Sequence, residues 1–326
     1  MEQKTTKTPP VHTCSFCFKT QREVEVLIKA PLGDVGICNE CHVLCGDIIE
    51  AHRRENIKML PRNENPQFCI ITPTAYCQRY ASQSTMHLVL AHLVASDSEY
   101  AQFYAHRNEF KIMDNGAFEL GYSYAPDKLL SLGTMCKADA IVLPDYPFQP
   151  AQKTIDESMA VIDEIRDAGF KTMFVPQSET GDVEDWINCY RWASENDAID
   201  IIGMSILGMP NAIPHIPTAY ARVVLTQILI ERGLFNFNKY HHYLGLNAGP
   251  ALEIPPLIEM NAMDSMDSSG PVWAGICGTM YSKMCDSYQP VRKISKHVDF
   301  AYPLVRDDWV HDAIQYNIDL TQSLLP

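Results

Sequence analysis

The stretch "NAMDSMDSSGP" (residues 261–271) places two aspartates, Asp264 and Asp267, three positions apart among small and apolar residues. No lysine or arginine occurs between Glu253 and Lys283, so the neighbouring sequence offers these carboxylates no cationic partner. An ionised carboxylate without a partner is costly to bury. One chemistry that uses such a group is attack on an anomeric sugar carbon, in which a second carboxylate acts as acid or base.

Polar residues also close other short apolar segments of the chain. Each of them alone is compatible with a loop cap or a solvated turn. Their recurrence at the same end of successive segments favours one shared site instead, because the carboxyl ends of barrel strands converge on one mouth. The residues concerned are Asp114, Asp145, Gln177, Gly203 with Ser205, Asn247 and Asp267.

Carboxylates and an amide at one mouth suggest a flat heterocyclic ligand such as guanine. Its N1–H and N2–H groups match a carboxylate such as Asp145, and its O6 matches the amide N–H of Gln177. Phe118, four residues after Asp114, offers an aromatic face for stacking on the base.

The elements that must position these groups are short apolar segments that alternate with helical patterns. Stretches such as "TIDESMAVIDEIRDAG" and "VEDWINCYRWASEN" are predicted to be helices. Repeated strand-then-helix units predict a parallel α/β fold, and about eight of them favour a (β/α)8 TIM-like barrel. The predicted strands are 68–74, 110–114, 139–145, 171–177, 199–206, 241–247, 262–269 and 298–303.

Four cysteines near the start form two C-x-x-C pairs, "CSFC" and "CNEC", and supply the candidate metal ligands Cys14, Cys17, Cys38 and Cys41. Two such pairs close a tetrahedral shell around a structural Zn²⁺. The alternatives are four unrelated reduced cysteines, or substitution of the fourth ligand by His42 or Cys45, for which a helix face is the simpler role. The segment between the pairs predicts a hairpin, and "HVLCGDIIEAHRRE" predicts a helix after it.

Composition sets the general class of protein. The chain has 326 residues, of which 46% are hydrophobic and 20% charged, which is enough for a large core. A net charge of −14 argues against a broadly basic nucleic-acid-binding surface. The sequence contains no apolar run of about 18 residues, so we expect no membrane span. Its polar start lacks the apolar region of a secretory signal. Eleven cysteines, an odd number of which four have metal-type spacing, favour the cytoplasm, which would be the host's if a phage encodes the chain.

The cysteine-rich segment resembles the N-terminal zinc-binding domain of the ClpX unfoldase over about 37 residues. The resemblance implies a module that binds partners and dimerises, without chemistry of its own. No G-x-x-x-x-G-K-[ST] motif follows, so the unfoldase motor is absent. We therefore expect a zinc-binding module at residues 1–54, a linker at 55–67 and a barrel at 68–326.

The barrel segment resembles the tRNA-guanine transglycosylase superfamily over roughly residues 68 to 300. The motifs that carry the resemblance are "IMDNGAF", "VLPDYPF", "MFVPQSE", "IIGMSILG", "YLGLNAGP" and "AMDSMDSSGP". The resemblance implies that Asp267 is the nucleophile and Asp114 the proton-transfer group. It implies that the base is bound by Asp145, Gln177, Gly203 and Ser205, with Phe118 stacking on it, and it leaves Asp264 a structural or supporting role.

Departures from the family bear on the polymer that carries the substrate base. The tRNA enzymes have a C-x-C-x-x-C…His zinc site after the nucleophile, whereas Cys277 and Cys285 are the only cysteines here, at a different spacing. The chain therefore resembles more closely the DNA-guanine transglycosylases of phages and bacterial genomic islands. The resemblance implies a pentosyltransferase that exchanges guanine in DNA for a 7-deazaguanine through a covalent aspartyl–sugar intermediate.

Three alternatives remain open on the sequence: a tRNA-guanine transglycosylase, a non-catalytic adaptor with a zinc hook and a remnant base-binding barrel, and a base-releasing glycosidase. DNA would have to present its guanine flipped or single-stranded. The expected partners are DNA, a 7-deazaguanine base, and a second copy or another protein bound by the zinc module. We expect a basic surface from Arg53, Arg54, Lys58, Arg62, Lys283, Arg292, Lys293 and Lys296.

Overall fold

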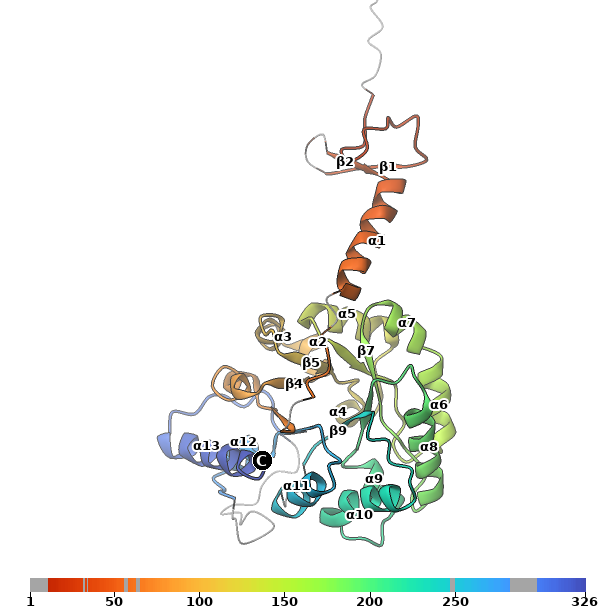
Figure 1. Cartoon of the computed structure of the whole chain (residues 1–326). Coiled ribbons are helices and arrows are strands. Elements are labelled where there is room, and N and C mark those ends of the chain that lie inside the picture. Colours follow the sequence, from red (N-terminus) through yellow and green to blue (C-terminus); the bar gives the residue numbers. More distant parts are fainter. Residues whose placement is uncertain are drawn as a thin grey trace, which may run out of the picture. The chain divides into compact units, whose positions relative to one another are not determined.

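The computed structural model describes residues 11–31, 33, 35–55, 58–62, 65–246, 250–281 and 298–326. The chain divides into two compact units, residues 1–57 and 58–326 (Figure 1). The buried side chains of each unit form a separate cluster, a large one in the second unit and a small one in the first. No described helix combines the length and the apolar character that crossing a membrane requires.

The first unit is a small hairpin followed by a helix. Strand β1 (Leu27–Lys29) pairs antiparallel with β2 (Gly36–Cys38), and helix α1 (Asn39–Glu55) begins at the next residue. The predicted hairpin and helix are therefore confirmed. The core of this unit consists of buried cysteine side chains with Val24, Leu27 and Ile37 packed against them. So few apolar groups do not form an independent core, and the cysteines have to supply the rest of the stability.

The second unit is built on eight parallel strands joined in the order β4-β5-β6-β7-β8-β9-β10-β3. The strands form a nearly closed barrel with helices on its outside, so the predicted (β/α)8 TIM-like fold is confirmed (Figure 1). Their bounds are β3 Gln67–Ile70, β4 Met86–Val89, β5 Phe110–Met113, β6 Ala140–Val142, β7 Lys171–Phe174, β8 Ile201–Gly203, β9 Tyr240–Tyr243 and β10 Ser265–Ser268.

The seam between β3 and β4 is closed by side chains instead of a strand ladder. Ser84 Oγ accepts a hydrogen bond from Ile70 N at 2.9 Å, and the Thr85 hydroxyl donates to the side-chain oxygen of Gln67. The Ser84 hydroxyl thus satisfies a backbone N–H of β3 that a ladder would otherwise pair.

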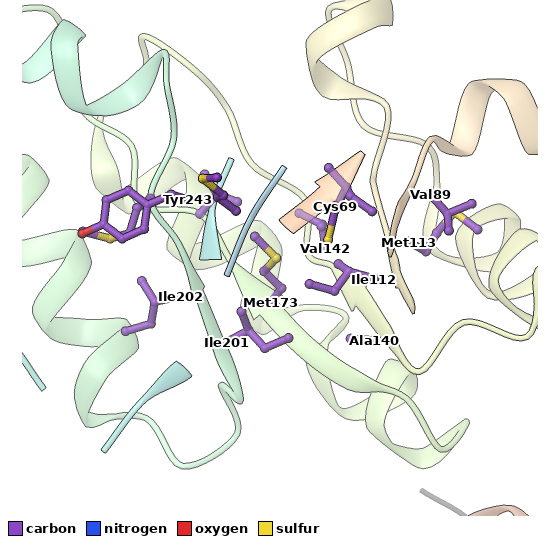
Figure 2. Packing of buried hydrophobic residues seen from close by; sticks show 14 of the residues in the cluster. Cys69, Val89, Ile112, Met113, Ala140, Val142, Met173, Ile201, Ile202 and Tyr243 are labelled. Carbon is purple, nitrogen blue, oxygen red and sulfur yellow. The ribbon is translucent and has the colours of Figure 1, made fainter. Parts of the chain in front are cut away.

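Apolar side chains from the strands fill one large core, and Figure 2 shows part of this cluster, with Ile112, Met173 and Ile201 among the labelled residues. The surrounding helices are α2 Ala91–Ser96, α3 Ser98–Ala105, α4 Ala117–Leu120, α5 Pro126–Cys136, α6 Ala151–Met159, α7 Ile162–Asp167, α8 Val183–Glu195, α9 Gly208–Ala212, α10 Thr218–Glu231, α11 Pro250–Glu259, α12 Gly270–Ile276 and α13 Asp308–Gln322.

The eighth strand is not where the sequence pattern placed it. Residues 298–303 form a turn, in which Asp299 Oδ1 accepts from Ala301 N at 3.0 Å and the Asp299 carbonyl accepts from Tyr302 N at 3.1 Å. Strand β4 takes that place in the barrel. The pattern hid β4 because one residue separates it from α2, so the two form a single apolar run, "MHLVLAHLVA".

Residues on β9 and β10 alternate between the inside and the outside of the barrel. On the outside, His241 Nε2 and Tyr190 Oη on α8 lie 2.9 Å apart, and Tyr243 Oη and Thr226 Oγ1 on α10 lie 2.9 Å apart. His242 and Ser265 therefore face the interior, where they meet at paired positions of the ladder. Asp267, two residues after Ser265, faces the same way.

Three aspartates recur at the amino ends of alternate strands. Each immediately precedes its strand and accepts a hydrogen bond from the second backbone N–H of the strand before it. The three pairs are Asp139 with Lys111 N (2.8 Å), Asp200 with Thr172 N (2.9 Å) and Asp264 with His241 N (2.8 Å). In return, the backbone N–H of each aspartate donates to the backbone carbonyl of its partner residue on the preceding strand.

The segment predicted to be a linker makes contacts at these amino ends. Lys58 Nζ donates to Asp139 Oδ2 at 3.1 Å, and Arg62 donates to the Asn238 carbonyl at 2.6 Å. Both cations thus lie at the end of the barrel opposite to the predicted site. The other members of the predicted basic surface are the side chains of Arg53 and Arg54 and the residues Lys283, Arg292, Lys293 and Lys296, all of which lie outside the described part of the chain.

Candidate functional site

The four predicted cysteine ligands come together in the first unit. Cys14 and Cys17 lie on the turn closed by the Thr13–Thr20 bridge, Cys38 ends β2, and Cys41 lies in the first turn of α1. All four sulfur atoms lie within 4.8 Å of one another. Cys45, one turn further along α1, is not part of this group.

The sulfur geometry fits a structural Zn²⁺. A tetrahedral site with Zn–S bonds of about 2.3 Å requires sulfurs about 3.8 Å apart, and Cys17 Sγ and Cys38 Sγ are 3.7 Å apart. Backbone N–H groups of Phe16 and Cys38 point at Cys14 Sγ, at 3.4 and 3.3 Å. Such N–H···S bonds stabilise the negative charge that thiolate ligands carry. The four residues therefore form a C4 zinc site.

The second group of polar side chains lies at the carboxyl ends of the barrel strands, and Asp145 accepts two amide hydrogen bonds there. This residue follows β6 and is 7% exposed. Asn115 Nδ2 donates to one of its oxygens and Gln177 Nε2 to the other, both at 2.7 Å. Burial raises the pKa of Asp145, and the two amide hydrogen bonds oppose that rise. Asp145 and Gln177, predicted to bind one ligand, are thus direct neighbours.

The residues around Gln177 determine which way its side-chain amide points. Its Oε1 is buried and accepts no hydrogen bond from any described residue. A Cβ on Gly208 would come within 2.7 Å of this oxygen, so only glycine leaves room for the amide there. A buried acceptor without a donor is costly, and a ligand N–H is one way to satisfy it.

Asp267 lies inside the barrel wall on β10 and is 4% exposed. Its Oδ1 is the acceptor for His242 Nε2 at 3.1 Å and for Gly245 N at 3.0 Å. The sequence offers Asp267 no lysine or arginine nearby, and the parallel ladder brings His242 beside it as a hydrogen-bond partner. In the described part of the chain, Oδ2 of Asp267 makes no hydrogen bond.

Asp114 directly follows β5, and its Oδ2 accepts from Gly116 N at 2.8 Å. Gly116 has φ +85°, a conformation that favours glycine. Burial, followed by the negative charges of Asp145 and Asp267, raises the pKa of Asp114 to about 7. The charges of the other two carboxylates therefore act on Asp114, which is able both to hold and to release a proton near neutral pH.

Glu119 on α4 is a fourth carboxyl group in this cluster. Burial, together with the charges of Asp114 and Asp267, raises its pKa to about 8. Its Oε2 lies 3.7 Å from His92 Nδ1, a buried nitrogen that makes no hydrogen bond within the described residues. At neutral pH this carboxyl group is able to remain protonated beside its charged neighbours.

The remaining predicted residues occupy different surroundings. A Cβ on Gly203 would meet side-chain atoms of Met173 and Val175 at 2.7 and 2.8 Å, so this glycine serves close packing between strands. Ser205 Oγ accepts from the backbone N–H groups at the start of α9. Phe118 is 64% exposed on α4. Asn247 lies outside the described residues.

Sequence reasoning missed Asn115, Glu119 and His242. The first two belong to the stretch "DNGAFE" that begins at Asp114, so a polar residue beside a predicted acid was the available signal. His242 gave no such signal, because finding it requires the register between β9 and β10.

The pKa of Asp114 leads to a prediction about stability. A carboxyl group whose pKa rises from 3.8 to about 7 on folding stabilises the fold below about pH 4 and loses that contribution as the pH rises through 7. Asp114→Asn does not titrate, so we expect it to unfold like wild type at pH 4 and to be about 1–3 kcal/mol more stable at pH 8, allowing for partial exposure. Urea unfolding at both pH values measures this, and a difference independent of pH would contradict it.

Two comparisons with known proteins give matches for this chain. Residues 12–51 match the family model of the ClpX C4-type zinc finger. Among solved structures, the chain matches a HpcH/Hpal aldolase/citrate lyase family protein from Burkholderia cenocepacia J2315, with 9% identity and a TM-score of 0.39, over 68% of this chain and 92% of that one. A TM-score of this size supports no inference about function.

Proposed function

We propose that this chain is a guanine transglycosylase acting on DNA, a pentosyltransferase that exchanges guanine for a 7-deazaguanine base. The observation that carries the proposal is the grouping of Asp114, Asp145 and Asp267 at the carboxyl ends of three strands, with Asp145 held by two amides. A base-exchange reaction needs three such groups, namely a nucleophile, a proton carrier and a reader of the base edge.

Base recognition is assigned to Asp145 and Gln177. Each oxygen of Asp145 accepts one amide hydrogen bond from the protein and keeps a further lone pair for N1–H and N2–H of guanine. The second hydrogen of Gln177 Nε2 is left for O6, and its Oε1, which accepts no hydrogen bond from the described residues, is a further acceptor at the site. A 7-deazaguanine has the same edge, because replacing N7 by carbon leaves N1, N2 and O6 unchanged.

The chemical step is assigned to Asp267 and Asp114. Oδ2 of Asp267 attacks C1′ of the sugar, the C1′–N9 bond breaks, and its electron pair goes to N9, which takes the proton of Asp114. Guanine leaves as a neutral base and the sugar is joined to Asp267 as an ester. The incoming base gives its N9 proton to Asp114, bonds to C1′ and releases the Asp267 carboxylate, so no oxidant or reductant is needed.

DNA is proposed over tRNA because the sequence after Asp267 lacks the cysteine spacing of the tRNA enzymes' zinc site. The substrate guanine has to be flipped or single-stranded, because C1′ and the base edge are not reachable together inside a duplex. The zinc finger is proposed to bind a protein partner or a second copy of the chain.

The test is to incubate the purified full chain with radiolabelled guanine and either single-stranded DNA or tRNA. Label retained by DNA supports the proposal, whereas label retained only by tRNA would assign the site to the RNA enzymes. Release of unlabelled guanine without incorporation would indicate a glycosidase, and no reaction with either polymer would favour the adaptor alternative.

Base binding gives a separate prediction. Asp145→Ala removes the acceptors for N1–H and N2–H and leaves the amides of Asn115 and Gln177 without their partner. We expect guanine affinity to fall by roughly 2–4 kcal/mol, because unpaired polar groups in a buried site strongly disfavour binding. Calorimetric titration of wild type, Asp145→Ala and Asp267→Asn measures this. Equal affinity of wild type and Asp145→Ala would remove Asp145 from the base site.

A further inference from the structure

Three inward-facing side chains on neighbouring strands form a line that ends at Asp267. Ser265 Oγ lies 2.7 Å from His242 Nδ1, and His242 Nε2 lies 3.1 Å from Asp267 Oδ1. His242 and Ser265 are fully buried. Both nitrogens of this imidazole are therefore engaged, one by a hydroxyl and the other by a carboxylate.

The chemistry of the partners fixes the direction of each hydrogen bond. An ionised carboxylate only accepts, so Nε2 must carry the hydrogen that points to Asp267. In a neutral imidazole Nδ1 is then an acceptor, and the Ser265 hydroxyl is its donor. Ser265 thus selects the tautomer that donates to Asp267.

The same carboxylate oxygen receives a second donor, Gly245 N, at 3.0 Å. Two donors converge on Oδ1, while Oδ2 has no hydrogen bond from the described residues. Two hydrogen bonds on one oxygen fix the plane of the carboxylate, and among the described residues none binds the other oxygen. After an ester forms through Oδ2, Oδ1 becomes its carbonyl oxygen and still accepts from both donors.

We propose that His242, oriented by Ser265, is a positioning residue that fixes the Asp267 carboxylate so that Oδ2 is the attacking atom. This proposal rests on the proposed function, because it assumes that Asp267 attacks a sugar carbon. It assigns a role to His242 and Ser265, which are not among the residues proposed to bind the base. Misplacement of a reacting group by about 1 Å is enough to slow a reaction about 100-fold.

The variants of His242 separate positioning from packing. Gln places its amide nitrogen near Nε2 and keeps the donor to Asp267, whereas Asn places it near Nδ1 and keeps only a bond to Ser265. We expect kcat for guanine exchange into single-stranded DNA to fall about 100-fold in His242→Asn and less than 10-fold in His242→Gln, with KM for the base unchanged in both. Equal losses in the two variants, or a loss confined to KM, would overturn the proposal.

A second measurement does not depend on activity. Long-range ¹H–¹⁵N spectra of the full chain report which nitrogen of His242 carries hydrogen. We expect the Nε2–H tautomer in wild type and a mixture of tautomers in Ser265→Ala. An Nδ1–H tautomer in wild type would refute the positioning role of His242 even if the enzyme is active. If wild type shows the expected Nε2–H tautomer but exchanges no base, the transglycosylase assignment is refuted instead.

Discussion

Asp267→Asn is expected to abolish base exchange and the covalent protein–DNA adduct. An amide does not form the sugar ester, so the loss should exceed about 10³-fold in kcat. The fold should survive, because the Asn side-chain oxygen is able to accept from His242 and Gly245 as Oδ1 of Asp267 does. Denaturing gels of protein incubated with labelled single-stranded DNA detect the adduct in wild type and its absence in the variant.

Asp264→Asn is the matched control for this experiment. Asp264 lies on the same segment, but its carboxylate accepts from His241 N at the amino end of the barrel, away from the predicted site. We therefore expect it to keep the adduct and to lose some stability. An adduct that persists in Asp267→Asn and disappears in Asp264→Asn would transfer the nucleophile to Asp264, and full exchange in both variants would exclude an aspartyl intermediate in this segment.

Removal of zinc is expected to unfold residues 12–51 and to leave the barrel folded. Few apolar contacts stabilise the finger without the metal, because its core consists of the cysteine side chains with Val24, Leu27 and Ile37. Zinc contributes about 10–16 kcal/mol of apparent binding free energy to comparable fingers, which is more than so small a core supplies. Elemental analysis should find one zinc per chain, and chelation should remove the finger's dispersed amide signals from an NMR spectrum while those of the barrel persist.

Cys45→Ser is the control for the metal ligands. Cys45 is on α1, one turn beyond Cys41, but outside the sulfur cluster. Cys41→Ser should lower zinc affinity strongly, and Cys45→Ser should not change it. Equal losses in both variants, or zinc-free protein with an intact finger spectrum, would contradict the C4 site.

The sequence was most informative where the signal is local. Two C-x-x-C pairs define the metal site without knowledge of the fold, because each pair supplies two ligands from one turn. Apolar segments bounded by polar residues located most of the strands for the same reason. Strand β4 was missed because a strand and a helix that follow each other closely share one apolar run, and periodicity alone does not divide such a run.

The candidate site was predictable only in part. The positions of Asp114, Asp145 and Asp267 at strand ends were visible in the sequence, and in the fold all three lie at the carboxyl ends of parallel strands. Their partners were not visible, since His242 and Asp267 are 25 residues apart and meet only through the register of β9 and β10. The roles of Gly203 and Ser205 were assigned by motif alone, and the structure places these residues in strand packing and in the start of α9.

The paired aspartates at the amino ends have a consequence for how this barrel can change over evolution. Asp139, Asp200 and Asp264 each fix one strand against the previous one at the end remote from the predicted chemistry. A shift of one residue would turn inward side chains such as His242 and Asp267 outward, and these contacts oppose that shift. The loops at the opposite mouth do not have to maintain the strand alignment, so insertions there can change the surroundings of the mouth while the inward-facing groups stay in place.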